Sequence, residues 1–110
     1  MFRQAYLCED TLGVWNDENH LIVRWHGGVF FSFTQMGDAI SAHFAAGPEA
    51  LRNVKEAIND FCSWAFYVMP WCKMIFACVT IKSVTRIIWK CGFVPLAIAD
   101  DAEILVRYRQ

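Results

Sequence analysis

The chain has 110 residues, which is enough for one domain with a hydrophobic core and too few for a second. Its ten basic and eleven acidic residues give a formal net charge of −1 and form no basic cluster, so the composition excludes a typical nucleic-acid-binding protein. Apolar residues make up 56% of the chain and charged residues 19%. This apolar excess favours self-association or docking on a protein partner, with tight packing of the aromatic side chains in the core as the alternative.

The chain shows no sign of export or of a membrane segment. Its first ten residues carry charges where a signal peptide has its apolar core. Its longest apolar stretch, residues 61–71, is much shorter than the roughly 20 residues that span a bilayer. These features predict a soluble, cytoplasmic protein without a membrane partner.

Strand signals dominate the chain up to residue 44, whereas residues 1–10 fit either a short helix or an extended lead-in. Segments rich in β-branched and aromatic residues alternate with clusters of turn formers, and Gly28 and Gly37 lie in two of these turns. The pattern predicts an antiparallel meander with strands at 12–15, 20–25, 29–34 and 39–44.

The hydrophobic period then changes to that of a helix, predicted over residues 48–66. Pro48 suits the first helical position, and Glu49 complements the positive end of the helix dipole. Apolar residues recur at steps of three and four, which places them on one buried face: Leu51, Val54, Ile58, Phe61 and Ala65.

The remaining residues predict a strand, a helix and a final hairpin. Residues 73–79 form an apolar run typical of a strand buried on both faces, and residues 82–90 form a second helix that ends before Gly92. Two strands follow at 93–99 and 103–109. The fold class is therefore α/β (α+β): one domain, 1–110, with a mixed, mostly antiparallel sheet, a central β-α-β unit and two main helices.

The five cysteines and three histidines do not have the spacing of a metal site. The cysteines form no C-x-x-C pair, and short loops do not bring them together with the histidines. Several cysteines lie in apolar segments, where a thiol behaves as a small hydrophobic group. We expect them to be reduced and buried, and we predict no metal. Cys78, at the end of its strand, could act as a nucleophile only beside a basic residue, and packing in the core is the preferred interpretation.

The segment TIKSVTRIIWKCGF, residues 80–93, resembles the strand-to-helix segment of the GNAT N-acetyltransferase superfamily. The similarity extends from about His20 to the C-terminus, so the domain resembles a truncated GNAT fold. The resemblance implies that acyl-CoA would lie between the fourth and fifth strands, with its pyrophosphate at the start of the first long helix. The matching positions for this cofactor are Ala46, Gly47 and Arg52.

Two features of the sequence depart from the family. Pro48 removes an amide from the phosphate cradle and Glu49 would repel a phosphate. Ile88 occupies the position where the family often has a tyrosine acting as general acid. His43, near the end of the fourth strand, is the candidate general base, since an unperturbed imidazole titrates near pH 6.5. A histidine held in the strand by backbone hydrogen bonds is the alternative.

The overall character of the chain is also similar to the head-assembly proteins of short-tailed enterobacterial phages. That resemblance implies a non-catalytic protein that helps to build the virion by protein–protein contacts, in the host cytoplasm or on the virion, and without a cofactor. The alternative is an active acyl-CoA-dependent N-acyltransferase that uses acetyl-CoA. Aromatic residues are the candidate contacts for a partner, although each suits the core equally: Trp15, Trp25, Trp64, Tyr67 and Trp71.

Overall fold

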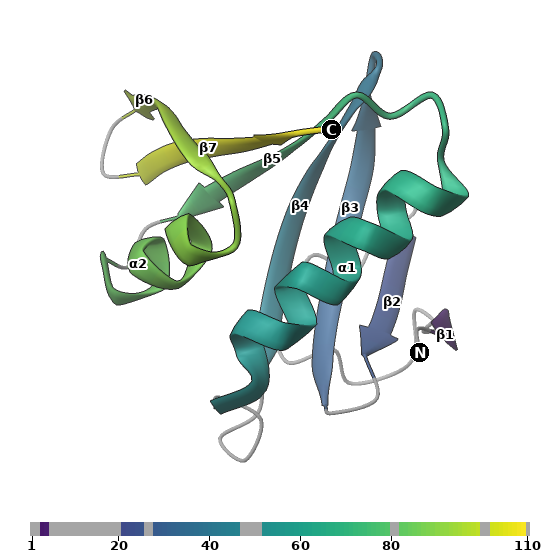
Figure 1. Ribbon diagram of the computed structural model, residues 1–110, viewed down its shortest axis with the longest axis horizontal. Helices are drawn as coiled ribbons and strands as arrows, with labels where there is room; N and C mark the ends of the chain where they lie inside the picture. Colours follow the sequence, from purple (N-terminus) through teal and green to yellow (C-terminus); the bar gives the residue numbers. More distant parts are fainter. Residues whose placement is uncertain are drawn as a thin grey trace.

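The protein folds into a seven-stranded mixed sheet with two helices on one face (Figure 1). The computed structural model describes residues 3–4, 21–25, 28–46, 52–79, 82–99 and 102–109. The strand order is β1-β2-β3-β4-β5-β7-β6. The elements, in chain order, are β1 (Arg3–Gln4), β2 (Leu21–Trp25), β3 (Val29–Met36), β4 (Ala39–Ala46), α1 (Val54–Val68), β5 (Met74–Val79), α2 (Lys82–Lys90), β6 (Val94–Ala99) and β7 (Ala102–Tyr108).

The predicted order of elements is confirmed for the described residues. The strands β3 and β4 each run two residues further than predicted. A tight turn at Gly37 and Asp38 lets β3 continue to Met36, and β4 continues to Ala46 because Ala45 and Ala46 pair with Phe30 and Val29 at the start of β3. Gly37 has a φ of 65°, which a residue without Cβ adopts at little cost. The predicted strand at 12–15 lies outside the described residues.

The first helix is displaced toward the C-terminus relative to its prediction. Its α-helical part begins at Val54, after one 3₁₀ turn at 52–53, and ends at Val68. Residues 47–51, which include Pro48 and Glu49, lie outside the described residues. The predicted buried face is confirmed where it is described: Val54, Ile58, Phe61 and Ala65 all belong to the core.

The predicted β-α-β unit is β4–α1–β5, and its strands pair in parallel from Ala39↔Met74 to Ala42↔Ala77. The final hairpin does not simply extend the sheet. β7 lies between β5 and β6 and is antiparallel to both. The second helix therefore connects two strands, β5 and β6, that are not neighbours in the sheet.

Two predictions about burial are wrong. Cys62, Cys72 and Cys91 are buried as expected, but Cys78 is exposed. The prediction that β5 is buried on both faces fails at the same position. Cys78 lies on the face of the sheet that points away from both helices, where Met74 and Phe76 of the same strand are also only half-buried.

The structure resolves most of the open alternatives for the aromatic residues. Trp25 is 2% exposed and donates a hydrogen bond of 2.9 Å from Nε1 to Asp60 Oδ2, and Trp64 packs against the core. Tyr67 and Trp71 are exposed and remain candidates for a partner contact. Trp15 lies outside the described residues.

Arg109 closes the C-terminal end of α1. Its guanidinium donates from Nη2 to the carbonyls of Phe66 and Met69 at 2.7 and 2.8 Å, and from Nε to the carbonyl of Cys72 at 2.7 Å. It also lies 4.9 Å from the Phe66 ring centroid. A cation here satisfies the carbonyls that a helix leaves unpaired and complements the helix dipole.

Replacing Arg109 by alanine is therefore expected to lower the free energy of unfolding by about 1–3 kcal/mol, measured by urea denaturation. Arg109→Lys should recover only part of this loss, because a lysine cannot reproduce the planar fork. The control is Arg86→Ala, at an exposed position of α2, which should change stability by less than about 0.5 kcal/mol. Equal losses for Arg109→Ala and the control would contradict the assigned role.

Candidate functional site

The sheet opens between β4 and β5. The parallel register of the two strands ends at Ala42↔Ala77, yet β4 continues to Ala46 and β5 to Val79. Over 43–46, β4 is still paired with β3 on its other edge. Figure 1 shows β5 and β7 turned away from β2, β3 and β4. We call this opening the splay.

A cavity of about 360 Å³ lies in the splay. This volume is within the range of small-molecule sites in proteins, about 300–1,000 Å³. Its lining residues come from the ends of both strands and from α2: Ala42, His43, Phe44, Ala45, Ala46, Ala77, Cys78, Val79, Val84 and Ile88.

The two sides of the splay differ in chemistry. Alternation along a strand puts Phe44 on the side of the helices, where its partner Phe31 stacks on Phe61 of α1. Val79 lies on the same side, in the core cluster with Ile88. Val84 and Ile88 of α2 line the cavity. The helix side of the splay is therefore apolar.

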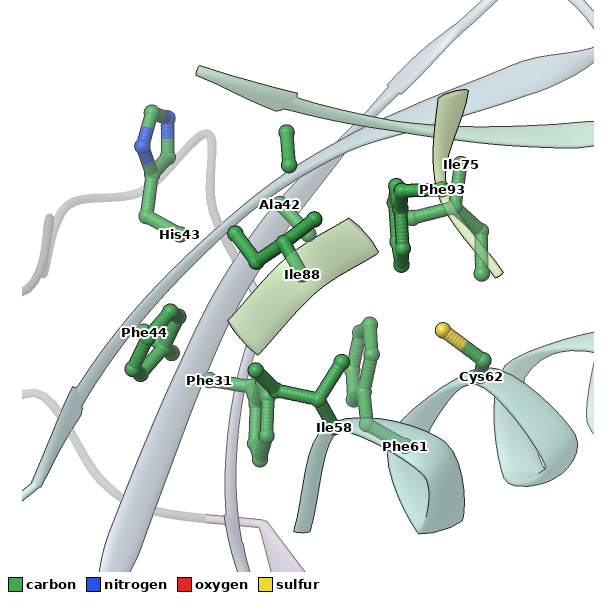
Figure 2. A pocket seen from close by; sticks show the side chains of 11 residues that line it. Phe31, Ala42, His43, Phe44, Ile58, Phe61, Cys62, Ile75, Ile88 and Phe93 are labelled. Atoms are coloured by element: carbon green, nitrogen blue, oxygen red, sulfur yellow. The ribbon is translucent and has the colours of Figure 1, made fainter. Parts of the chain in front are cut away.

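A smaller apolar cavity of about 30 Å³ shares some of these walls and extends toward α1. Figure 2 shows Ile58 and Phe61 of α1 on one side of it and Ile88 of α2 close to Ala42. Ile88 is only 2% exposed. The position that the family resemblance assigns to a general acid thus lies on the cavity wall, and it carries an aliphatic side chain.

His43 and Cys78 lie on the opposite side of the sheet. They are the next residues after the last paired positions, Ala42 and Ala77, and so they share the face that points away from the helices. In Figure 2 the His43 ring points away from Phe44 and Ile88. The structure therefore brings an imidazole and an exposed thiol to the mouth of one cavity.

The residues predicted to hold the cofactor are only partly described. Ala46 ends β4 and lines the cavity. Arg52 is exposed in the turn that precedes α1, and it is not among the residues that line the cavity. Gly47 lies outside the described residues. The sequence favours a core position for Cys78 over a role as nucleophile, because it does not show which face of β5 reaches the cavity.

The open edge of β4 offers peptide groups to a ligand. Beyond Ala42 the register with β5 no longer uses the N–H and C=O groups on that edge. An extended ligand that carries amides can add to such an edge as a strand does. The apolar side chains beside it favour an alkyl or thioether chain.

Neither a metal-ligand group nor a membrane-spanning helix is found in the part of the chain that the structure describes. No group of three or more histidine, cysteine, aspartate or glutamate side chains in the described ranges could hold a metal ion. Among the same residues, neither helix is long and apolar enough to cross a bilayer.

Comparisons with known proteins support the fold. No protein-family model and no curated protein match the sequence, so the resemblance to phage head-assembly proteins stays a prediction. The structure is similar to the N-acetyltransferase PseH of Campylobacter jejuni in complex with acetyl coenzyme A, with a TM-score of 0.70 and 12% identity over 86% of this chain and 71% of that chain.

Two further solved structures have the same arrangement. A Bacillus subtilis acetyltransferase in complex with CoA has a TM-score of 0.70 and 12% identity over 84% of this chain and 79% of that chain. The spermidine N-acetyltransferase of Vibrio cholerae, a dodecamer, has a TM-score of 0.67 and 13% identity over 84% of this chain and 66% of that chain. The splayed sheet with its two helices on one face is the fold of the GNAT acetyltransferases.

Proposed function

We propose that the protein binds the acyl-pantetheine end of an acyl-CoA in the splay and transfers the acyl group to an amine. The observation that carries this proposal is the cavity between the ends of β4 and β5, which has an open strand edge and an apolar wall. Solved structures of the same fold are described as acetyltransferases, two of them in complex with CoA or acetyl-CoA.

In this proposal, the residues on the two sides of the sheet have different roles. The edge of β4 binds the amides of the pantetheine arm, and a peptide N–H beyond Ala42 polarises the thioester carbonyl. Val84 and Ile88 exclude water from the helix side of the thioester. His43 faces the other side, where an incoming amine would approach, and accepts the proton that the amine loses on acylation. Arg52 would contact the phosphates.

Calorimetric titration with acetyl-CoA tests the donor site. Ala46→Leu places a larger side chain in the cavity and is expected to weaken binding at least about tenfold, because the ligand loses space at the strand edge. Arg52→Ala should weaken it by about threefold to tenfold, since it removes one exposed charge beside the phosphates.

The control is Ala97→Leu, at an exposed position of β6 outside the splay, which should leave the affinity unchanged. Absence of acetyl-CoA binding at millimolar concentration, or binding that Ala46→Leu does not alter, would contradict the proposed donor site.

A second candidate function is that of a non-catalytic binding protein, such as one that acts in phage head assembly. Two observations favour it: Ile88 offers no proton where a general acid would stand, and apolar side chains are exposed on the edge strand β6, namely Val94, Leu96 and Ile98. This candidate predicts no acetyl-CoA binding. It also predicts that Ile98→Glu abolishes the contact with the virion protein, measured by co-purification from infected cells.

A further inference from the structure

The exposed thiol at the end of β5 is a chemical group that amine acylation does not use. Cys78 lines the splay cavity together with His43 and lies on the same face of the sheet. Each residue follows the last paired position of its strand, so they stand across the opening from each other. The cavity thus combines space for a ligand, a nucleophilic atom and a base.

The other described cysteines have a different environment. Cys62, Cys72 and Cys91 are buried, and burial raises the pKa of each thiol. A thiol with a raised pKa forms little thiolate near neutral pH and reacts slowly. Of the described cysteines, Cys78 alone is exposed.

We propose that Cys78 accepts the acyl group from acyl-CoA and becomes an acyl-thioester. The proposal rests on the donor site proposed above. His43 takes the proton of the Cys78 thiol, and the sulfur forms a bond with the acyl carbon as the bond between that carbon and the CoA sulfur breaks. The CoA sulfur then receives the proton from His43 and leaves as a free thiol. One thioester replaces another, so the step needs no oxidant or other co-reactant.

The two sides of the splay differ in access to a bound donor, and this difference would direct the exchange to Cys78. A donor on the edge of β4 has its helix side covered by Val84 and Ile88, so its thioester is open only toward the face that carries Cys78 and His43. The CoA thiolate is a good leaving group, so its departure needs no strong proton donor, and the proton that His43 takes from Cys78 neutralises it. An aliphatic residue at position 88 is compatible with such a step.

The test is the intact mass of the full chain after incubation with acetyl-CoA under reducing conditions, followed by peptide mapping. We expect one acetyl group on Cys78, removable by neutral hydroxylamine as a thioester is. Cys78→Ala should abolish it, Cys72→Ser should retain it, and His43→Gln should slow its formation about 100-fold. The chain unfolded in urea should show no preference for Cys78.

A thermal-shift titration with CoA, which cannot acylate the protein, separates this proposal from the donor site. Stabilisation by CoA without acetylation of Cys78 would overturn the thiol's role and leave the donor site standing. Acetylation spread equally over several cysteines in the folded chain would overturn it as well. Absence of any stabilisation, together with absence of acetylation, would overturn both proposals.

Discussion

Replacing Phe61 by alanine is expected to lower the free energy of unfolding by about 4 kcal/mol. Phe61 is 2% exposed and lies where α1 meets the sheet. Its ring stacks on Phe31 with centroids 4.4 Å apart and an interplanar angle of 6°, and it meets Phe33 edge-on at 5.6 Å. Truncation removes both ring contacts and leaves a cavity that rigid strands cannot fill.

The measurement is urea denaturation followed by tryptophan fluorescence and by circular dichroism, with the slope of the transition compared between variants. Phe61→Leu keeps most of the volume and should cost less than half as much. The control Tyr67→Ala, at a side chain 84% exposed on the same helix, should change stability by less than about 0.5 kcal/mol. A loss below about 2 kcal/mol for Phe61→Ala would contradict the conclusion that this ring is a main contact between α1 and the sheet.

Phe61 also shows which parts of the fold local sequence determines. The three- and four-residue spacing that places Phe61 and Ile58 on one face depends only on helical geometry, so the buried face of α1 could be predicted. The end of α2 could be predicted for a similar reason. Gly92 has a φ of 87°, and the amides of Gly92 and Phe93 bond back to the carbonyls of Trp89 and Ile88.

Which strands are neighbours in the sheet is harder to predict from the sequence, because pairing joins segments that are far apart in the chain. The sequence predicts a hairpin of strands at 93–99 and 103–109, and nothing in these residues indicates that β7 rather than β6 joins β5. Packing decides this: Leu105 of β7 lies in the core shared with α1, whereas the side chains of β6 from Val94 to Ile98 are exposed.

The residues of the candidate site also differ in how far the sequence predicts their positions. Ile88 could be placed from its distance to Gly92, since both lie in one helical segment, and it does line the cavity. His43 was predicted near the end of its strand. Cys78 was assigned to the core because its neighbours in sequence are apolar. Its exposure follows from its place on the face that points away from both helices, which the sequence of one strand does not reveal.

Stability is expected to fall steeply at alkaline pH because of Cys62. This thiol is fully buried on α1, and desolvation raises its pKa from 9.0 to about 12, even though the nearby charge of Arg107 and a hydrogen bond from it act in the opposite direction. Below pH 9 the thiol is protonated in both the folded and the unfolded chain, so its full contribution is present there. Above pH 9 the unfolded chain loses this proton while the folded chain keeps it until about pH 12. The unfolded state then binds fewer protons, and stability decreases as pH rises.

The slope from Cys62 approaches about −1.4 kcal/mol per pH unit above pH 9, which amounts to about −2 kcal/mol between pH 9 and pH 11 because the unfolded thiol is only half ionised at pH 9. Burial also raises the pKa of Cys72 and Cys91, so these thiols act in the same direction. Tyrosines and lysines titrate in this range as well, and the informative quantity is therefore the difference between the wild type and Cys62→Ala. Urea denaturation from pH 8 to pH 11 under reducing conditions should show a shallower decline for the variant, by close to one proton. Parallel declines would mean that the Cys62 thiol ionises as readily in the folded chain as in the unfolded one. Water would then reach a thiol that is 0% exposed in the folded chain.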